Sequence, residues 1–300
     1  MEETLNDVLV VDLGFSSAKY MYGSVKGRVP SAFRSQAGGY VYGEDALVKA
    51  GSSYLKTPEE LIRHYPAFVK MCMARAGITP EKKVKLAVGL PYGFWLMEAR
   101  PGGAVGVLAD SLKLENVSSV SVLPQGLGGI KAYLSKEVPN GNILAVDIGF
   151  NTVIYALFDI SSGKLIHGNT FNKRGIHQMA NDHVLPRIAH LAPARTFTPL
   201  ETSILIERGE LQYGFDQHDI RGEISQAAED YVKAVMEDIY GEIQAESGLM
   251  GGSTTVLLFG GGGALLRSSM EGKKSPFTIL EEPEYANARG FALLAAETRV

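Results

Sequence analysis

The sequence of 300 residues contains a single cysteine, Cys72. One cysteine excludes an intramolecular disulfide and a zinc site built from several thiolates. Cys72 lies in the apolar helical pattern FVKMCMARAG, which predicts a thiol buried in the core. The scarcity of cysteine therefore leaves carboxylates, amides and backbone groups as the candidates for a functional site.

The chain also lacks long apolar runs and blocks of basic residues. No run approaches the roughly 20 apolar residues of a membrane-spanning helix. The acidic start, MEETLND, has neither the basic end nor the apolar segment of a signal peptide. The net charge of −4 argues against direct nucleic-acid binding through a cationic patch. We therefore expect a cytoplasmic protein with no membrane or nucleic-acid contact, long enough for two domains.

One stretch organises what is present. Residues 8–23 read VLVVDLGFSSAKYMYG, and residues 143–158 repeat the pattern as ILAVDIGFNTVIYALF. The two copies share Leu9/Leu144, Val11/Val146, Asp12/Asp147, Gly14/Gly149, Phe15/Phe150 and Tyr20/Tyr155. An internal repeat over this distance predicts two similar domains with a site between them.

Each copy predicts a strand, a tight turn and a second strand, since its first arm is apolar and β-branched. Gly14 and Gly149 can adopt positive φ in the turns and let backbone N–H groups approach a ligand. Asp12 and Asp147 end buried strands, where a carboxylate is costly unless it is paired or bound to a cation. Facing hairpins would hold a phosphate chain and Mg²⁺. Ordinary hairpins with turn aspartates are the alternative, and the duplication argues against it.

Other regular elements follow from periodicity and capping. Thr57 is expected to cap a helix that starts at Pro58 and ends before Gly77. The remaining expected strands are 84–90, 117–123, 164–170 and 254–259, and the expected helices are a short one ending at residue 133 and those at 58–76, 175–190, 220–246 and 284–298.

Two junctions carry further candidate groups. Gln125 lies where a strand passes into a helix, where its amide either orients a water molecule or satisfies the loop backbone. Residues 260–263 are four glycines between a strand and a helix, a pattern that exposes backbone N–H groups to anions. The run is neither a G-x-G-x-x-G fingerprint nor a Walker A motif.

Taken in this order, the motifs resemble the actin, Hsp70 and sugar-kinase ATPase superfamily, and most closely the bacterial and archaeal actin-like plasmid-segregation proteins of the ParM/StbA type. The matching segments are 12–19, 124–129, 147–152 and 260–263, and the closing EYANARGFALLAAE is similar to the last helix of those proteins. The resemblance implies an α/β actin-like fold of two duplicated, ribonuclease H-like domains around a nucleotide cleft. Domain I would comprise 1–141 and 284–300, with a small subdomain at about 31–80, and domain II would comprise 142–283.

The resemblance also implies roles for individual residues. Asp12 and Asp147 would organise Mg²⁺ through water molecules, and Gln125 would position the attacking water. Lys19 would contact phosphate, whereas the second copy has Ile154 in that place. The expected nucleotide contacts are Gly14, Phe15, Ser16, Ser17, Lys19, Gly149, Phe150, Asn151, Thr152, Gly175, Glu207, Gly260, Gly261 and Gly262. The resemblance implies ATP as the nucleotide, and GTP is possible because Phe15 and Phe150 replace residues that are often small or polar in the family.

The function implied is an ATPase that polymerises into filaments and moves or segregates plasmid or other DNA through an adaptor protein. Two alternatives stay open: a small-molecule kinase of the same superfamily, for which Asp110 is a candidate base by residue type, and a non-motile actin-like scaffold. The retention of Asp12, Asp147, Lys19 and Gln125 argues against a scaffold with an inactive site.

Overall fold

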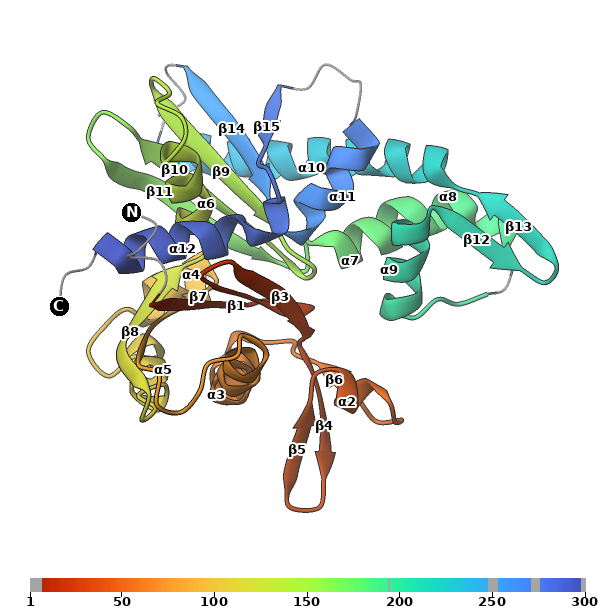
Figure 1. Cartoon of the computed structure of the whole chain (residues 1–300). Coiled ribbons are helices and arrows are strands. Elements are labelled where there is room, and N and C mark those ends of the chain that lie inside the picture. The colour runs from red at the N-terminus through yellow and green to blue at the C-terminus, as the bar shows by residue number, and fades with distance from the viewer. Residues whose placement is uncertain (1–6, 194, 248–252, 271–275, 298–300) are drawn as a thin grey trace.

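The computed structural model describes residues 7–193, 195–247, 253–270 and 276–297. Two five-stranded sheets lie side by side, and the last helix runs between them (Figure 1). The first sheet has the order β3-β2-β1-β7-β8 and the second has the order β11-β10-β9-β14-β15. In both sheets the first three strands along the chain are antiparallel neighbours, and the later two add parallel strands. The duplication seen in the sequence is thus a duplication of topology.

The first sheet is built from β1 (Val8–Leu13), β2 (Ser17–Tyr22), β3 (Val25–Pro30), β7 (Val84–Leu90) and β8 (Val117–Pro124). One face packs on α3 (Pro58–Arg75) and α5 (Ala104–Ser111), and this core includes Cys72, as predicted. Thr57 caps α3 by accepting a hydrogen bond from the N–H of Glu60, and Gly77 has φ 71° just beyond the helix. Pro66 lies inside α3. A shorter helix, α4 (Tyr92–Glu98), follows β7.

The second sheet consists of β9 (Asn142–Ile148), β10 (Thr152–Asp159), β11 (Lys164–Asn172), β14 (Thr254–Phe259) and β15 (Phe277–Ile279). Its outer face packs on the long helix α10 (Arg221–Ser247), which confirms the helix expected over 220–246, and on α11 (Gly261–Met270). The helix expected over 175–190 is irregular: α7 (Ile176–Met179) passes through a π-helical turn, Ala180–Val184, into α8 (Leu185–Ile188) and a 3₁₀ turn, Ala189–Leu191. Pro186 has no N–H for a regular ladder, which explains the break.

Two helices fill the space between the sheets. The helix α6 (Leu127–Leu134) packs on β9 and β14, whereas α12 (Ala286–Glu297) packs on β1 and β7. They cross with their backbones in contact, because a Cβ atom on Gly290 would lie 1.8 Å from the carbonyl oxygen of Gly128. The closing helix was expected over 284–298; its first turn is a 3₁₀ turn, Pro283–Tyr285, and residue 298 lies outside the described residues.

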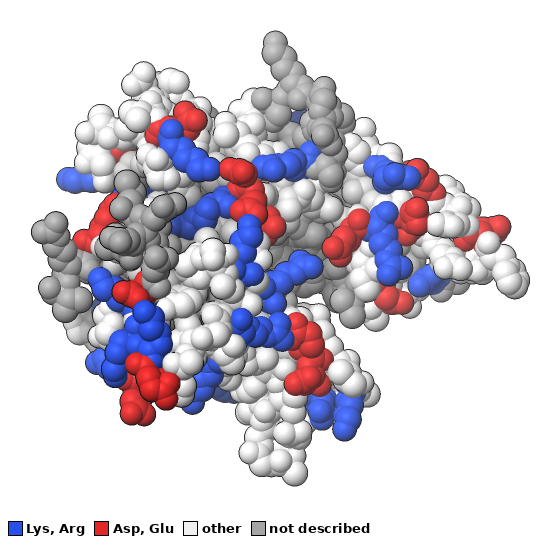
Figure 2. Space-filling view, in the orientation of Figure 1, with Lys and Arg blue, Asp and Glu red and all other residues white. Residues whose placement is uncertain are grey.

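Two small lobes project from the sheets, with an open notch between them (Figures 1 and 2). The first lobe contains a three-stranded sheet of β4 (Ala32–Gln36), β5 (Gly39–Tyr42) and β6 (Ser53–Tyr54) with α2 (Glu44–Leu47). The second contains α9 (Pro199–Arg208) and the hairpin of β12 (Glu210–Tyr213) and β13 (Asp216–Asp219), which was not anticipated. No described helix is both long and apolar enough to cross a bilayer.

Candidate functional site: a cleft between two hairpins

The two duplicated hairpins face a common cleft. In the first, Asp12 pairs with Lys19 across β1 and β2, and the N–H of Gly14 donates to the carbonyl of Ser17 at 3.1 Å. In the second, Asp147 pairs with Ile154 across β9 and β10, and Gly149 donates to Thr152 at 2.9 Å. The same register therefore places one carboxylate at the same point of each hairpin.

The glycines of these turns act through their size. Gly14 and Gly149 are not among the described residues with positive φ, so these turns do not use the left-handed conformation that glycine permits. A Cβ atom on Gly14 would lie 3.4 Å from Lys19 Nζ, and one on Gly149 would lie 3.2 Å from the carbonyl oxygen of Thr152. Each tip is closed by its own backbone hydrogen bond, and the missing Cβ keeps the loop narrow at the cleft.

Gly260 is the position where glycine is required for both conformation and space. Its φ is 84°, and a Cβ atom there would lie 2.1 Å from Asp147 Oδ1. Its N–H donates to the carbonyl of Pro283 at 2.8 Å, and α11 begins at the next residue. The chain thus passes from β14 to α11 directly beside Asp147, which brings the start of a helix to the cleft.

Each aspartate is held by a different carboxamide. Gln125 Nε2 donates to Asp12 Oδ1 at 2.7 Å, and Asn287 Nδ2 donates to Asp147 Oδ2 at 2.6 Å. Asp12, Asp147, Gln125 and Asn287 are all buried, with exposures of 4–7%. A buried carboxylate needs such donors, because removal from water otherwise penalises its charge strongly.

The electrostatic balance differs between the two carboxylates. Burial raises the pKa of Asp12, while Lys19 and the Gln125 amide act in the opposite direction. Burial, together with the nearby charge of Asp12, raises the pKa of Asp147 to about 7, although Asn287 and Lys19 lower it. Two buried acidic groups that disfavour their own charge form a site that a cation would stabilise.

These residues fit Mg²⁺ better than a cage made of protein ligands alone. No group of three or more His, Cys, Asp and Glu side chains able to hold a metal occurs in the described part of the chain. Magnesium often binds through one or two carboxylates, with water and phosphate oxygens completing its octahedron. Asp12 and Asp147 would hold the ion in that way, and Lys19 supplies a positive charge for phosphate on the same side.

Most of the expected contacts meet in the cleft. Its lining includes twelve expected residues: Asp12, Gly14, Phe15, Ser16, Lys19, Gln125, Asp147, Gly149, Phe150, Thr152, Gly260 and Gly261. Phe15 is only 6% exposed and belongs mainly to the first core, and Phe150 packs near His177 with ring centroids 5.6 Å apart. The hairpin-tip phenylalanines are thus packed against protein as well as facing the cleft.

Five expected residues do not line the cleft. Ser17, Asn151 and Gly262 lie beside lining residues, and Gly262 packs against Ile148 and Ile176. Gly175 lies against the backbone of Phe150, where the N–H groups of Ile176 and His177 donate to the hairpin tip. Glu207 is exposed on α9 and is not among the cleft-lining residues, so its expected nucleotide contact stays a prediction.

Sequence reasoning missed several groups at the site. Leu13, Leu61, Pro91, Ile154, Glu284 and Asn287 also line the cleft. Tyr65, fully buried on α3, uses its hydroxyl to tie β1 to β7 beneath Asp12: it accepts from the N–H groups of Leu13 and Gly89 at 3.2 and 3.0 Å and lies 2.8 Å from the carbonyl oxygen of Val11. A capped amphipathic helix was the only sequence signal for Tyr65.

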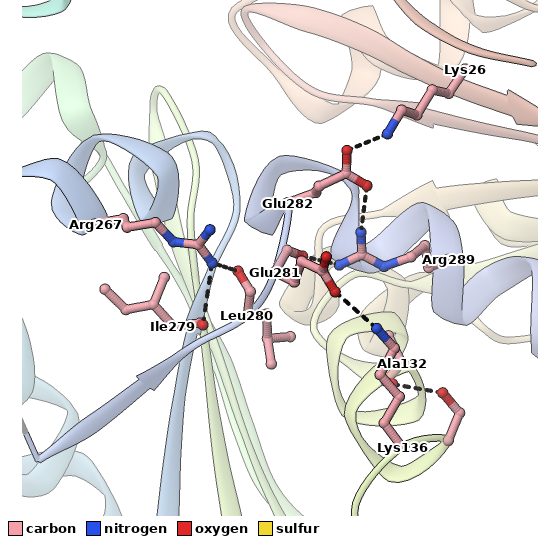
Figure 3. Close-up of polar contacts among 10 residues, drawn as sticks. Lys26, Ala132, Lys136, Arg267, Ile279, Leu280, Glu281, Glu282 and Arg289 are labelled. Atoms are coloured by element: carbon pink, nitrogen blue, oxygen red, sulfur yellow. Dashed lines mark hydrogen bonds and ion pairs between the residues drawn. The ribbon is translucent and has the colours of Figure 1, made fainter.

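The segment that leads into α12 is also held outside the cleft. Glu282, with φ 41°, forms ion pairs with Lys26 of β3 and with Arg289 of α12 (Figure 3). Arg289 also donates to the carbonyl of Glu281, whose side chain pairs with Lys136 at 2.9 Å. These contacts fix the crossing from the second sheet back to the first.

The chain shares its fold with solved structures, although its sequence has no match. No protein-family model matches the chain, and no curated protein matches it by sequence. Its structure is nevertheless that of the actin-like proteins, which confirms the predicted fold.

Three solved structures illustrate this likeness. A ParM in a 15-stranded filament from Clostridium botulinum superposes with a TM-score of 0.71 at 17% identity, over 97% of this chain and 99% of that one. An archaeal actin homologue in complex with ADP superposes with a TM-score of 0.73 at 16% sequence identity, over 97% of this chain and 99% of that one. MreB 5 of Spiroplasma citri bound to AMPPNP superposes with a TM-score of 0.64 at 14% sequence identity, over 96% of this chain and 95% of the other.

Proposed function

We propose that the chain is a nucleotide-dependent polymerising ATPase of the actin type. The observation that carries this proposal is the pair of duplicated hairpins that bring Asp12 and Asp147 into one cleft between the two sheets. The solved structures support it, since one is a filament and two carry ADP or AMPPNP. ATP is the proposed nucleotide, with GTP as the outcome to compare, and Mg²⁺ is the proposed ion.

The chain's own residues would divide the work. Backbone N–H groups of the hairpins and the start of α11 would bind phosphate oxygens, with Lys19 as a charged partner. Bound Mg²⁺ would neutralise phosphate charge during transfer to water. Gln125 would orient that water beside Asp12, and the buried carboxylates would hold the ion. We infer that 1–141 with 284–300 and 142–283 act as the two domains that close on the nucleotide.

We further infer that assembly moves or segregates DNA through an adaptor. Figure 2 shows basic and acidic residues interspersed over the visible face, with neighbours of opposite sign on both lobes. Mixed charge on this face does not supply the basic surface that direct binding to phosphate backbones uses. A protein adaptor would therefore connect a filament to its cargo.

Sedimentation tests the proposal. The protein is centrifuged at high speed with Mg-ATP, Mg-ADP, Mg-GTP or no nucleotide, and phosphate release is measured in the same tubes. ATP-dependent pelleting that is lost in Asp147→Ala is the expected result. Protein that stays in the supernatant under every condition overturns the polymerisation proposal.

Asp110→Asn is the matched control. Asp110 lies on α5, its side chain is 72% exposed and it pairs with Lys113 at 2.7 Å, outside the cleft lining. Its exposure offers no buried base for a kinase, and the control should therefore pellet and hydrolyse as the wild type does. Phosphate transfer that needs an added sugar and fails in Asp110→Asn would instead indicate the kinase.

A further inference from the structure

Asn287 is a polar residue of the cleft to which the resemblance assigned no role. It lies in the first turn of α12 and is 4% exposed. Its Nδ2 donates to Asp147 Oδ2 at 2.6 Å, and its Oδ1 accepts from the N–H of Gly126 at 3.0 Å. Both ends of the carboxamide are therefore used, and the donor at Gly126 fixes which end faces the carboxylate.

The backbone beneath Asn287 is held by the crossing of α6 and α12. A Cβ atom on Gly128 would lie 2.5 Å from the carbonyl oxygen of Asn287 and 2.7 Å from its Cα atom. One turn further on, Gly290 makes the same close approach to Gly128. Since neither helix has room to slide towards the other, the side chain of Asn287 projects from a fixed point.

Asn287 also joins the two halves of the molecule. The neighbouring residues Ala288 and Phe291 pack into the core formed with β1 and β7 of the first sheet. Asp147, the acceptor of the Asn287 hydrogen bond, lies on β9 of the second sheet. By contrast, Gln125 and Asp12 both belong to strands or strand ends of the first sheet. The amide of Asn287 is thus a link between the sheets at the floor of the cleft.

This link controls the orientation of Asp147. One oxygen of the carboxylate faces Asn287, and the other lies at the Gly260 turn, where even a Cβ atom would collide with it. A hydrogen bond to an ionised acceptor is both strong and directional. Without this hydrogen bond, the Asp147 carboxylate would be free to rotate away from the cleft that both it and Asp12 line.

We propose that Asn287 is a positioning residue, which fixes the Asp147 carboxylate against the start of α6 so that the two aspartates hold Mg²⁺ and nucleotide phosphate together. The inference rests on the proposed nucleotide-binding function. It adds that the Mg²⁺-dependent part of nucleotide affinity depends on a side chain from the last helix, which does not itself ligate the ion.

The test measures ADP affinity by equilibrium fluorescence titration, in Mg²⁺ and in EDTA, and takes the ratio of the two. Asn287→Leu removes both hydrogen bonds while keeping the size of the side chain. Asn287→Ala removes both hydrogen bonds without adding bulk or charge beside Asp147, so it serves if the leucine variant folds poorly. In both variants the ratio of ADP affinity in Mg²⁺ to that in EDTA is expected to fall about tenfold, while the ADP affinity in EDTA changes little.

Ala295→Gly is the control for a merely structural role. Ala295 lies two turns along α12, is 4% exposed and packs on the first sheet, so its loss weakens the helix without touching the cleft. It should lower the melting temperature and retain the wild-type ratio. Asn287 variants that retain the wild-type ratio overturn the positioning role alone. Wild-type protein that binds no ADP in either condition overturns the proposed function as well.

Discussion

The β1–β2 and β9–β10 hairpins share register, turn hydrogen bond and carboxylate, yet they surround that carboxylate differently. Asp12 faces Lys19 across its hairpin, whereas Asp147 faces Ile154, which is 2% exposed. Asp12 receives its amide from Gln125, just beyond the end of β8 in the same sheet, whereas Asp147 receives it from a helix anchored on the other sheet. Duplication has preserved the backbone scaffold, and the side chains around it have made one half cationic and the other dependent on contact between the halves.

The largest expected effect comes from removing the less compensated charge. The pKa of Asp147 is raised from 3.8 to about 7 in the folded protein. Between those values the native state holds a proton that the unfolded chain has lost, so stability falls by about 1.4 kcal/mol per pH unit as pH rises. Below this pH window Asp147 is protonated in both the folded and the unfolded states. Above it, the full cost of the buried charge to folding stability remains. Asp147→Asn should therefore stabilise the protein increasingly from pH 4 to pH 7.

Urea unfolding without nucleotide or metal, at a series of pH values, checks this prediction. The comparison is the difference in unfolding free energy between wild type and variant. Asp110→Asn, an exposed aspartate with a surface partner, should show no comparable rise. Asp12→Asn removes the charge that helps raise the Asp147 pKa and should move the window to lower pH. A flat difference for Asp147→Asn would contradict the assigned burial penalty.

The second prediction removes the cation from the first hairpin. Lys19→Met should weaken ADP binding about tenfold or more, because a charge-assisted contact to phosphate is lost. Ile154→Met changes the corresponding position of the second hairpin and should alter affinity by less than about twofold. Isothermal titration of both variants measures the asymmetry. Equal losses would show that the two hairpins contribute alike.

The third prediction concerns how each half is held beneath its hairpin. Tyr65→Phe leaves the N–H groups of Leu13 and Gly89 without their buried acceptor. We expect a loss of about 2 kcal/mol in the free energy of unfolding, since unsatisfied buried donors are costly. In the second half, the Tyr231 hydroxyl donates to the Arg174 carbonyl at 2.5 Å in a partly buried position. Tyr231→Phe should lower the free energy of unfolding by about 1 kcal/mol. Denaturant unfolding of the Tyr65→Phe and Tyr231→Phe variants compares the two losses. Equal losses would contradict the prediction that Tyr65 contributes more.

The sequence predicted the hairpins because strand pattern, turn and carboxylate all lie within sixteen residues and occur twice. It also predicted the glycine junction between β14 and α11 and the Thr57 cap, where local geometry selects the residue type. In each case the physical constraint acts between neighbours along the chain. Such constraints leave a pattern that can be read before any tertiary contact is known.

The contacts that complete the site act over long separations. Asn287 lies 140 residues from Asp147 and 161 from Gly126, and only the tertiary structure brings them together. Tyr65 has the pattern of an ordinary core residue on an amphipathic helix, and only the structure shows its hydroxyl between two strands. Glu207 is matched by residue type and is exposed on α9, and its nucleotide contact stays a prediction. Residue type alone therefore did not place the side chains that no local motif fixes.

The smallest expected effect separates the two ways in which α12 is attached. Inside the cleft, Asn287 links the halves through buried hydrogen bonds; outside, Lys26 and Glu282 link them through an ion pair whose side chains are 43% and 46% exposed. Water and salt screen such a pair, so Lys26→Met should cost less than about 1 kcal/mol in unfolding free energy, and less still at high ionic strength. Denaturant unfolding at low and high salt measures this. A salt-independent loss would show instead that Lys26 acts through the Tyr285 ring, whose centroid lies 5.5 Å from the lysine Nζ.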